Sequence, residues 1–172
     1  HRHFLYLPGP KYNLSQTRRY AGIMDALSEA NVPASNIREI DYHTVFGSSA
    51  ESTSSYKPYE ELFFPVNYTA VIGFNDLQSY SAMEILQKKG YRIPEDISLI
   101  SFDHLRKTHT YLPPLTSIAD NSEKSIADTA VSILLDKIRN PSSEISSEVL
   151  PVSIFDDHTT GPINETFAHS FE

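Results

Sequence analysis

Residues 68–103 read YTAVIGFNDLQSYSAMEILQKKGYRIPEDISLISFD, and this stretch decides the fold class. It opens with a nearly all-apolar run at 70–74, as expected for a strand that is buried on both faces. Apolar residues then recur at helical spacing, and Gly90 ends the predicted helix. These recurring residues are Leu77, Tyr80, Met83 and Leu86. A second strand follows at 97–102, so the stretch predicts two parallel strands joined by a covering helix.

Short β-rich runs alternate with helical runs in the rest of the chain as well. The predicted elements there are strands at 4–7, 37–42 and 148–155, an extended segment at 115–118, and helices at 15–30 and 121–139. The second of these helices is strongly amphipathic, with an apolar stripe made of Ile126, Ala130, Ile133, Leu134 and Ile138. The alternation is typical of a parallel sheet flanked by helices, and the predicted fold class is therefore α/β.

Three segments have weaker patterns. Residues 47–55 are rich in serine and are predicted to form a loop, and residues 56–64 are predicted to form a short helix. The polar tail after Thr160 is expected to be loosely held, as chain ends often are.

Composition narrows the function classes. The 172 residues include 14 Lys and Arg against 22 Asp and Glu, which gives a net charge of −8, and no cysteine. A chain of this kind fits one compact cytoplasmic domain, or one lobe of a larger one, without disulfides or thiolate metal sites. Its basic residues are scattered, so direct binding to nucleic acid is not expected, and no apolar stretch approaches the roughly 18 residues of a membrane span. Because the chain opens at His1 with neither an initiator methionine nor a leader, we expect a fragment of a longer protein.

Polar residues follow the predicted strands at the points where the strands end. In a parallel sheet these ends lie at one edge, where loops carry ligand-binding side chains. The residues are Gly9 and Pro10, Tyr42, Asn75 and Asp76, and Asp103, with Arg19 about one turn into the first helix and over the same edge. A guanidinium, an amide, carboxylates and a ring suit a polar uncharged ligand that is similar to a sugar or a nucleoside.

Each of these residues also has a structural interpretation. A helix begins at Asp76, so this residue is expected to cap the helix rather than to contact a ligand. Asn75 is expected either to form the turn or to contact the ligand, and Arg19 either to lie in solvent or to reach the site. Asp103 ends a buried strand, where a carboxylate favours a functional role.

The known enzyme signatures are missing from the sequence. It contains no nucleophile elbow, phosphate-binding loop or dinucleotide fingerprint, so an enzyme is not expected. Seven histidines occur without the spacing of a metal-ligand set, and neither a metal nor a cofactor is predicted. An α/β enzyme that uses Asp76 and Asp103 as acid and base is the weaker alternative.

Five motifs occur in an order and spacing that extend from about residue 3 to 155. They are Gly9-Pro10, RRYAG at 18–22, VIGFND at 71–76, GYRIPEDISLISFD at 90–103 and PPLTSI at 113–118. In these motifs the chain resembles the effector-binding region of the lactose/galactose-repressor (LacI/GalR) family of bacterial transcription regulators. The long motif that ends at Asp103 is the most specific of the five.

The resemblance implies a periplasmic-binding-protein-like (type I) fold with two lobes and a ligand cleft between them. Residues 1–118 then correspond to the second lobe, residues 119–141 to a helix that packs on the first lobe, and residues 142–172 to a return strand and polar tail of the second lobe. Most of the first lobe and the helix-turn-helix headpiece would precede His1. Without that lobe the apolar stripe is expected to face solvent and to promote self-association.

By the same resemblance, Arg19, Asn75 and Asp103 bind the effector, and Tyr42 and Asp120 lie near it. The expected function is a cytoplasmic sensor that binds a small effector, in the first place a sugar, and controls DNA binding allosterically. A homodimer is expected, with contacts from residues 77–89 and from the segment around Tyr111. Operator DNA is a partner only through the missing headpiece, and no membrane is involved. The alternative is a sugar-binding protein of a transport system.

Overall fold

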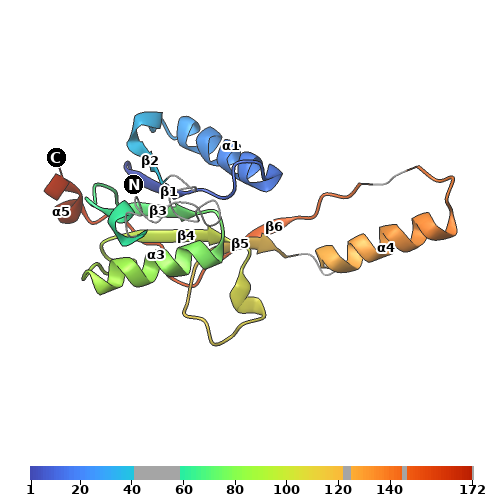
Figure 1. Ribbon diagram of the computed structural model, residues 1–172. Helices are drawn as coiled ribbons and strands as arrows, with labels where there is room; N and C mark the ends of the chain where they lie inside the picture. The colour runs from blue at the N-terminus through green and yellow to red at the C-terminus, as the bar shows by residue number, and fades with distance from the viewer. Residues whose placement is uncertain (41–58, 122–124, 145–146, 172) are drawn as a thin grey trace, which may run out of the picture.

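A six-stranded sheet in the order β2-β1-β3-β4-β5-β6 forms the centre of the protein (Figure 1). The computed structural model describes residues 1–40, 59–121, 125–144 and 147–171. The strands are β1 (Phe4–Leu7), β2 (Ile37–Glu39), β3 (Ala70–Gly73), β4 (Ser98–Phe102), β5 (Ser117–Asp120) and β6 (Val152–Phe155). The first five run parallel, and β6 pairs antiparallel with β5, so that Asp120 lies opposite Val152. The predicted α/β class, with a largely parallel sheet, is confirmed.

Two helices cover opposite faces of the sheet, α1 (Leu14–Glu29) on one face and α3 (Asp76–Lys88) on the other (Figure 1). From β1 the chain crosses to β2 on one side, whereas β3 and β4 extend the sheet on the other side. Right-handed crossovers in opposite directions place their helices on opposite faces. The strand order therefore reverses between β1 and β3, and ligands of such sheets bind beyond the carboxyl ends of the strands at this position.

The core lies between the sheet and α3. Leu5, Val71 and Leu99 stand side by side on β1, β3 and β4 and are fully buried. Each such side chain contributes about 1.5–3 kcal/mol of hydrophobic free energy. Other fully buried members of the core are Phe63, Tyr68, Leu86, Ile97 and Leu115. This packing fixes the strand ends from which the functional side chains project.

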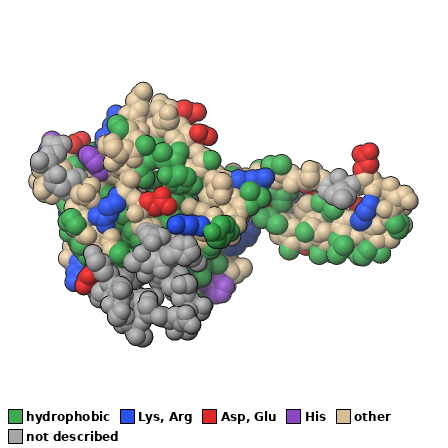
Figure 2. Space-filling view, turned by 45° about the horizontal axis from the view of Figure 1, so that its top comes forward, with side chains coloured by type: hydrophobic (Ala, Val, Ile, Leu, Met, Phe, Trp, Pro, Cys, Tyr) green, Lys and Arg blue, Asp and Glu red, His purple; other side chains and the backbone are tan. Residues whose placement is uncertain are grey.

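Between β5 and β6, the described residues 125–144 and 147–151 form an arm that extends away from the sheet and carries α4 (Ile126–Arg139) (Figure 1). The predicted start of this helix at residue 121 is wrong, because Ser125 caps it in a reciprocal capping box with Asp128. Ile126, Leu134 and Ile138 of the predicted stripe expose 63%, 58% and 64% of their surfaces. Figure 2 shows apolar side chains gathered along the projecting arm. Among the described helices, none combines the length and apolar character that a membrane span requires.

The C-terminal residues are held more firmly than predicted. The backbone N–H of Gly161 donates to Oγ of Ser98 at 3.0 Å. Farther along, Phe167 of α5 (Glu165–Ala168) packs edge-on against Tyr91, with 5.9 Å between the ring centres. The prediction of a loose tail after Thr160 is therefore wrong, because an aromatic residue within it joins the core.

Two weaker predictions are tested only in part. A 3-10 helix at Tyr59–Phe63 occupies much of the short helix that was predicted at 56–64. The strand predicted at 37–42 is present as far as Glu39. The serine-rich segment at 47–55 lies outside the described residues.

Candidate functional site

Arg19 projects from the second turn of α1 to the carboxyl ends of β3 and β4. Its Nη2 donates to Oδ1 of Asp103 at 2.7 Å, and its Nη1 donates to the carbonyl oxygen of Phe74. Asp103 directly follows β4, and Phe74 directly follows β3. One guanidinium therefore joins the first helix to the ends of two neighbouring strands, and the structure brings Arg19 and Asp103 together.

The guanidinium of Arg19 lies over two aromatic rings. Its Cζ atom is 4.8 Å from the ring centre of Phe74 and 4.7 Å from that of Phe102. Contacts of this kind are worth about 0.5–2 kcal/mol each, with the larger values where water is excluded. Both rings thus contact the guanidinium, while its N–H groups donate hydrogen bonds to Asp103 and Phe74. Sequence reasoning missed both rings, although each of them directly precedes a polar residue at a strand end.

Asp103 lies in a turn with a left-handed backbone. Its φ angle is +99°, and that of His104 is +49°. Residues other than glycine adopt such conformations at a cost of about 1–3 kcal/mol each, and they persist where the surrounding structure fixes them. The side chain of Asp103 is 42% exposed and that of Arg19 is 25% exposed. The pair is therefore open to solvent on one side, and its unused lone pairs and N–H groups are accessible to a ligand.

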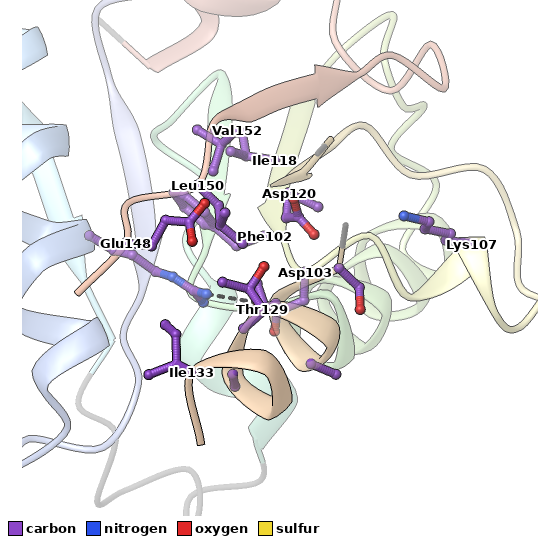
Figure 3. A pocket seen from close by; sticks show the side chains of 16 residues that line it. Phe102, Asp103, Lys107, Ile118, Asp120, Thr129, Ile133, Glu148, Leu150 and Val152 are labelled. Atoms are coloured by element: carbon purple, nitrogen blue, oxygen red, sulfur yellow. Dashed lines mark hydrogen bonds and ion pairs between the residues drawn. The ribbon is translucent and has the colours of Figure 1, made fainter. Parts of the chain in front are cut away.

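A hollow of about 810 Å³ opens beside this pair, between α4 and the ends of β4, β5 and β6 (Figure 3). Its charged lining residues are Arg19 and Lys107 against Asp103, Asp120 and Glu148. Three carboxylates and two cations leave an excess of hydrogen-bond acceptors, which favours a ligand rich in hydroxyl donors over an anion. Most of the remaining wall is apolar, and it includes Phe102, Ile118, Ile133, Leu150 and Val152.

Asn75 and Asp76 both lie at the start of α3. Asn75 is the N-cap of α3, and its Oδ1 accepts a hydrogen bond from the backbone N–H of Gln78 at 3.0 Å. The prediction that Asp76 caps the helix is wrong, because Asp76 lies one residue inside it. Its carboxylate accepts instead from the N–H of Leu105 and the hydroxyl of Ser117, each at 2.7 Å. Asn75 does not line the hollow, but it directly follows Phe74, whose carbonyl binds Arg19.

The two remaining predicted residues have different outcomes. Asp120 lines the hollow at the end of β5, on the side opposite α4 (Figure 3). Tyr42 lies outside the described residues. Glu148 and Leu150 also line the hollow and were missed, because an isolated strand pattern gives no sign that the chain returns past the ends of β4 and β5.

A buried hydrogen-bond network supports the turn after β1. Oε1 of Gln16 accepts from the Tyr6 hydroxyl at 2.8 Å and from the N–H of Gly9 at 2.7 Å. Burial raises the pKa of Tyr6 to about 12, so its phenol stays protonated and keeps donating. Because Gly9 lies against the ring of Phe74, this network also fixes one of the two rings that contact Arg19.

The site shows no metal chemistry within the described ranges. Among those residues, no group of three or more His, Cys, Asp or Glu side chains could hold a metal ion. The arrangement instead offers a planar hydrogen-bond donor, carboxylate acceptors and apolar walls. Such a combination can bind a small polar molecule and orient it.

A family model of the periplasmic binding protein-like domain matches residues 1–160. The chain belongs to this family. The HTH-type transcriptional repressor PurR of Escherichia coli O139:H28 is 34% identical over 155 residues, which are 88% of this chain and 43% of that protein. This periplasmic binding protein-like chain thus spans less than half of the length of that curated relative. By this similarity it corresponds to part of the effector-binding domain of a LacI/GalR regulator.

Solved structures of the family have the same fold. A dimeric Lac repressor with an 11-residue C-terminal deletion matches with a TM-score of 0.72 at 25% identity, over 95% of this chain and 57% of that one. A LacI family regulator from Enterococcus faecium with bound ribose matches with a TM-score of 0.74 at 24% identity, over 95% of this chain and 57% of the other. At 24% identity, the comparison with the Enterococcus faecium regulator establishes the fold alone.

Proposed function

We propose that the chain is the second-lobe part of the ligand-sensing domain of a bacterial transcription regulator, and that it binds a small hydroxylated effector, in the first place a sugar. The observation that carries the proposal is the Arg19–Asp103 pair at the edge of a hollow where acceptor groups outnumber cations. Asn75, Asp120 and Tyr42 complete the set of proposed effector contacts. Hydroxyl groups would donate to the carboxylates and accept from the guanidinium, while the apolar wall would cover the face of a sugar ring.

The shape of the described residues supports the lobe assignment. In the proposed division, residues 1–118 and 142–172 belong to the second lobe, and the helix in 119–141 extends away from the sheet with an exposed apolar stripe. In the proposed regulator this helix packs on a first lobe, and the hollow becomes one half of a cleft between the two lobes. An effector that binds the closed arrangement better than the open one shifts the population towards the closed form.

DNA binding and dimer formation belong to the same proposal. Operator DNA would be bound by a headpiece outside this chain, because the net charge of −8 disfavours contact with phosphates. Leu77 on α3 and Tyr111 expose 65% and 81% of their surfaces, and they would provide apolar contacts of a homodimer. A regulator of this kind acts in the cytoplasm, where its operator is.

Replacing Asp103 tests the effector site. Calorimetric titration of the full-length protein with a panel of pentoses, hexoses, disaccharides and nucleosides should identify a ligand whose affinity Asp103→Ala lowers at least about a hundredfold, because hydrogen bonds to charged groups contribute about 1.5–3 kcal/mol each. The control is Asp25→Ala, which removes an exposed carboxylate of α1 that does not line the hollow. Equal affinity of Asp103→Ala and the unmodified protein would refute the proposal.

A further inference from the structure

Three consecutive backbone amides after β4 donate to groups from other elements. The N–H of Asp103 donates to the carbonyl of Ile118 at 2.9 Å, and that of His104 donates to Oγ of Ser117 at 2.9 Å. The N–H of Leu105 donates to Oδ2 of Asp76 at 2.7 Å. The turn that carries Asp103 is therefore fixed by β5 on one side and by the start of α3 on the other.

Asp76 is the centre of this arrangement, although it does not line the hollow. Its side chain is buried, with only 1% of the residue exposed, and both of its oxygens accept hydrogen bonds. The Ser117 hydroxyl donates its hydrogen to Oδ1 of Asp76. The lone pairs of the same Ser117 oxygen are therefore available to accept a hydrogen bond from the N–H of His104. The N-terminal end of α3 further favours a negative charge at this position.

The left-handed backbone of the turn explains why these hydrogen bonds are needed. Asp103 and His104 both have positive φ angles, which side chains other than glycine disfavour. If the amides lost their acceptors, the turn would relax to an extended or right-handed conformation, and the Asp103 carboxylate would turn away from Arg19. Stacking of the His104 ring on Phe155, at 4.2 Å between centres, holds the same turn from a third side.

We propose that Asp76 is a positioning residue, which acts through Ser117 and the 103–105 turn to hold the Asp103 carboxylate against Arg19. The inference rests on the proposed function, because it gives an effector-site role to a residue that is remote from the effector. It also explains the burial of a carboxylate that is neither the helix cap nor a ligand contact.

The test compares two buried serines on neighbouring strands, Ser117 on β5 and Ser101 on β4, whose hydroxyl groups have different partners. Ser117→Ala removes the acceptor of the His104 amide and one donor to Asp76, whereas Ser101→Ala removes a hydroxyl that accepts from Ser79. Both residues are fully buried. In the full-length protein we expect Ser117→Ala to speed hydrogen exchange at residues 103–105 and to weaken binding of the panel ligand, each about tenfold or more. Ser101→Ala should change neither by more than about twofold.

Two further variants keep the result decisive. Ser117→Thr retains the hydroxyl and should restore slow exchange and ligand affinity, which a purely steric role of Ser117 would not predict. Asp76→Asn should speed exchange at Leu105 in the same way. If Ser117→Ala exchanges and binds like Ser101→Ala, the positioning role is overturned while the Asp103 result still stands for the proposed function. If Asp103→Ala retains full affinity, the proposed function is overturned, and the exchange rates alone decide whether Asp76 holds the turn.

Discussion

At residue 19 the choice of arginine over lysine has a clear physical basis. The group must contact the rings of Phe74 and Phe102 while its N–H groups donate to a carboxylate and a carbonyl. A planar guanidinium meets both demands, whereas an ammonium is a compact, strongly hydrated charge that cannot stack. The aromatic contacts also reduce the freedom of a long side chain before a ligand arrives, so less conformational entropy is lost on binding.

Asp96 should give the protein a component of acid sensitivity. Hydrogen bonds from Arg92 lower the pKa of Asp96 to about 2, below the value of about 3.9 in an unfolded chain. A carboxyl with a lowered pKa contributes stability that is complete above pH 4 and is lost as the pH falls towards 2. Asp96→Asn should therefore lower the free energy of unfolding at pH 7, and its difference from the unmodified protein should shrink between about pH 4 and 2.

The measurement is urea unfolding at several pH values. Asp25→Asn, which removes an exposed carboxylate of α1, is the control for a general loss of negative charge. A stability difference for Asp96→Asn that stays constant from pH 7 to 2 would show that the Arg92 contact contributes nothing.

Two glycines should respond to alanine in opposite directions. A Cβ atom at Gly9 would lie 2.6 Å from ring atoms of Phe74, which is itself buried. Gly9→Ala should therefore destabilise the protein by about 1–3 kcal/mol, as overpacking does, and displace the ring on which Arg19 stacks. At Gly22, within α1, a Cβ atom would meet nothing within 4 Å, so Gly22→Ala should stabilise by about 0.5–1 kcal/mol. Chemical denaturation of both variants measures the two signs, and equal signs would contradict the packing argument.

At the scale of elements, most of the sheet could be predicted from local pattern. The strand at 4–7 and the strand-helix-strand unit at 68–103 carry apolar runs and helical spacing that tertiary packing only reinforces. The start of α4 could not be located in this way, since periodicity extends across a cap, and the capping pair at Ser125 and Asp128 decides where hydrogen bonding begins.

The candidate site was predictable only in part, and for a related reason. Strand ends in a parallel sheet share an edge, so Arg19 and Asp103 could be placed together from the order of elements. The role of Asp76 depends on β5 and on the turn after β4, which are distant in sequence. A helix start at Asp76 favoured a local cap, and the structure replaces that local explanation with a long-range one.

The apolar stripe of α4 should make this chain associate when it is studied by itself. Ile126, Leu134 and Ile138 expose apolar surface along one side of the helix, and surfaces of this kind seek a partner. Leu134→Glu combined with Ile138→Glu should shift the chain towards a monomer in light scattering. The control is Ser132→Glu combined with Arg139→Gln, which lies on the opposite side of the helix, changes the charge by the same two units and should leave association unchanged. A monomer at high concentration without any substitution would contradict this expectation.

At the scale of the whole molecule, the arm is an insertion between two paired strands of the sheet, β5 and β6. The chain leaves the sheet after Asp120 and re-enters it at Val152, and these two residues are paired neighbours in the ladder. A two-residue Asn-Gly link in place of 121–151 would close them into an ordinary hairpin. The shortened lobe should still unfold in one cooperative thermal transition. Its melting temperature should fall by about 2–4 °C for each kcal/mol of stability that the lost arm contacts contribute. Circular dichroism would follow the transition, and a shortened chain without one would show that the arm is required for folding.

That geometry bears on how such a protein could have been assembled and altered. Because Asp120 and Val152 are neighbours in the sheet, a segment inserted between them can change which partners the lobe contacts without disturbing the hydrogen bonds of the sheet. The arm is thus an insertion site whose two ends are fixed by the sheet. Segments of other lengths, or helices with other side chains, could be inserted there while the ion pair between Arg19 and Asp103 remains intact.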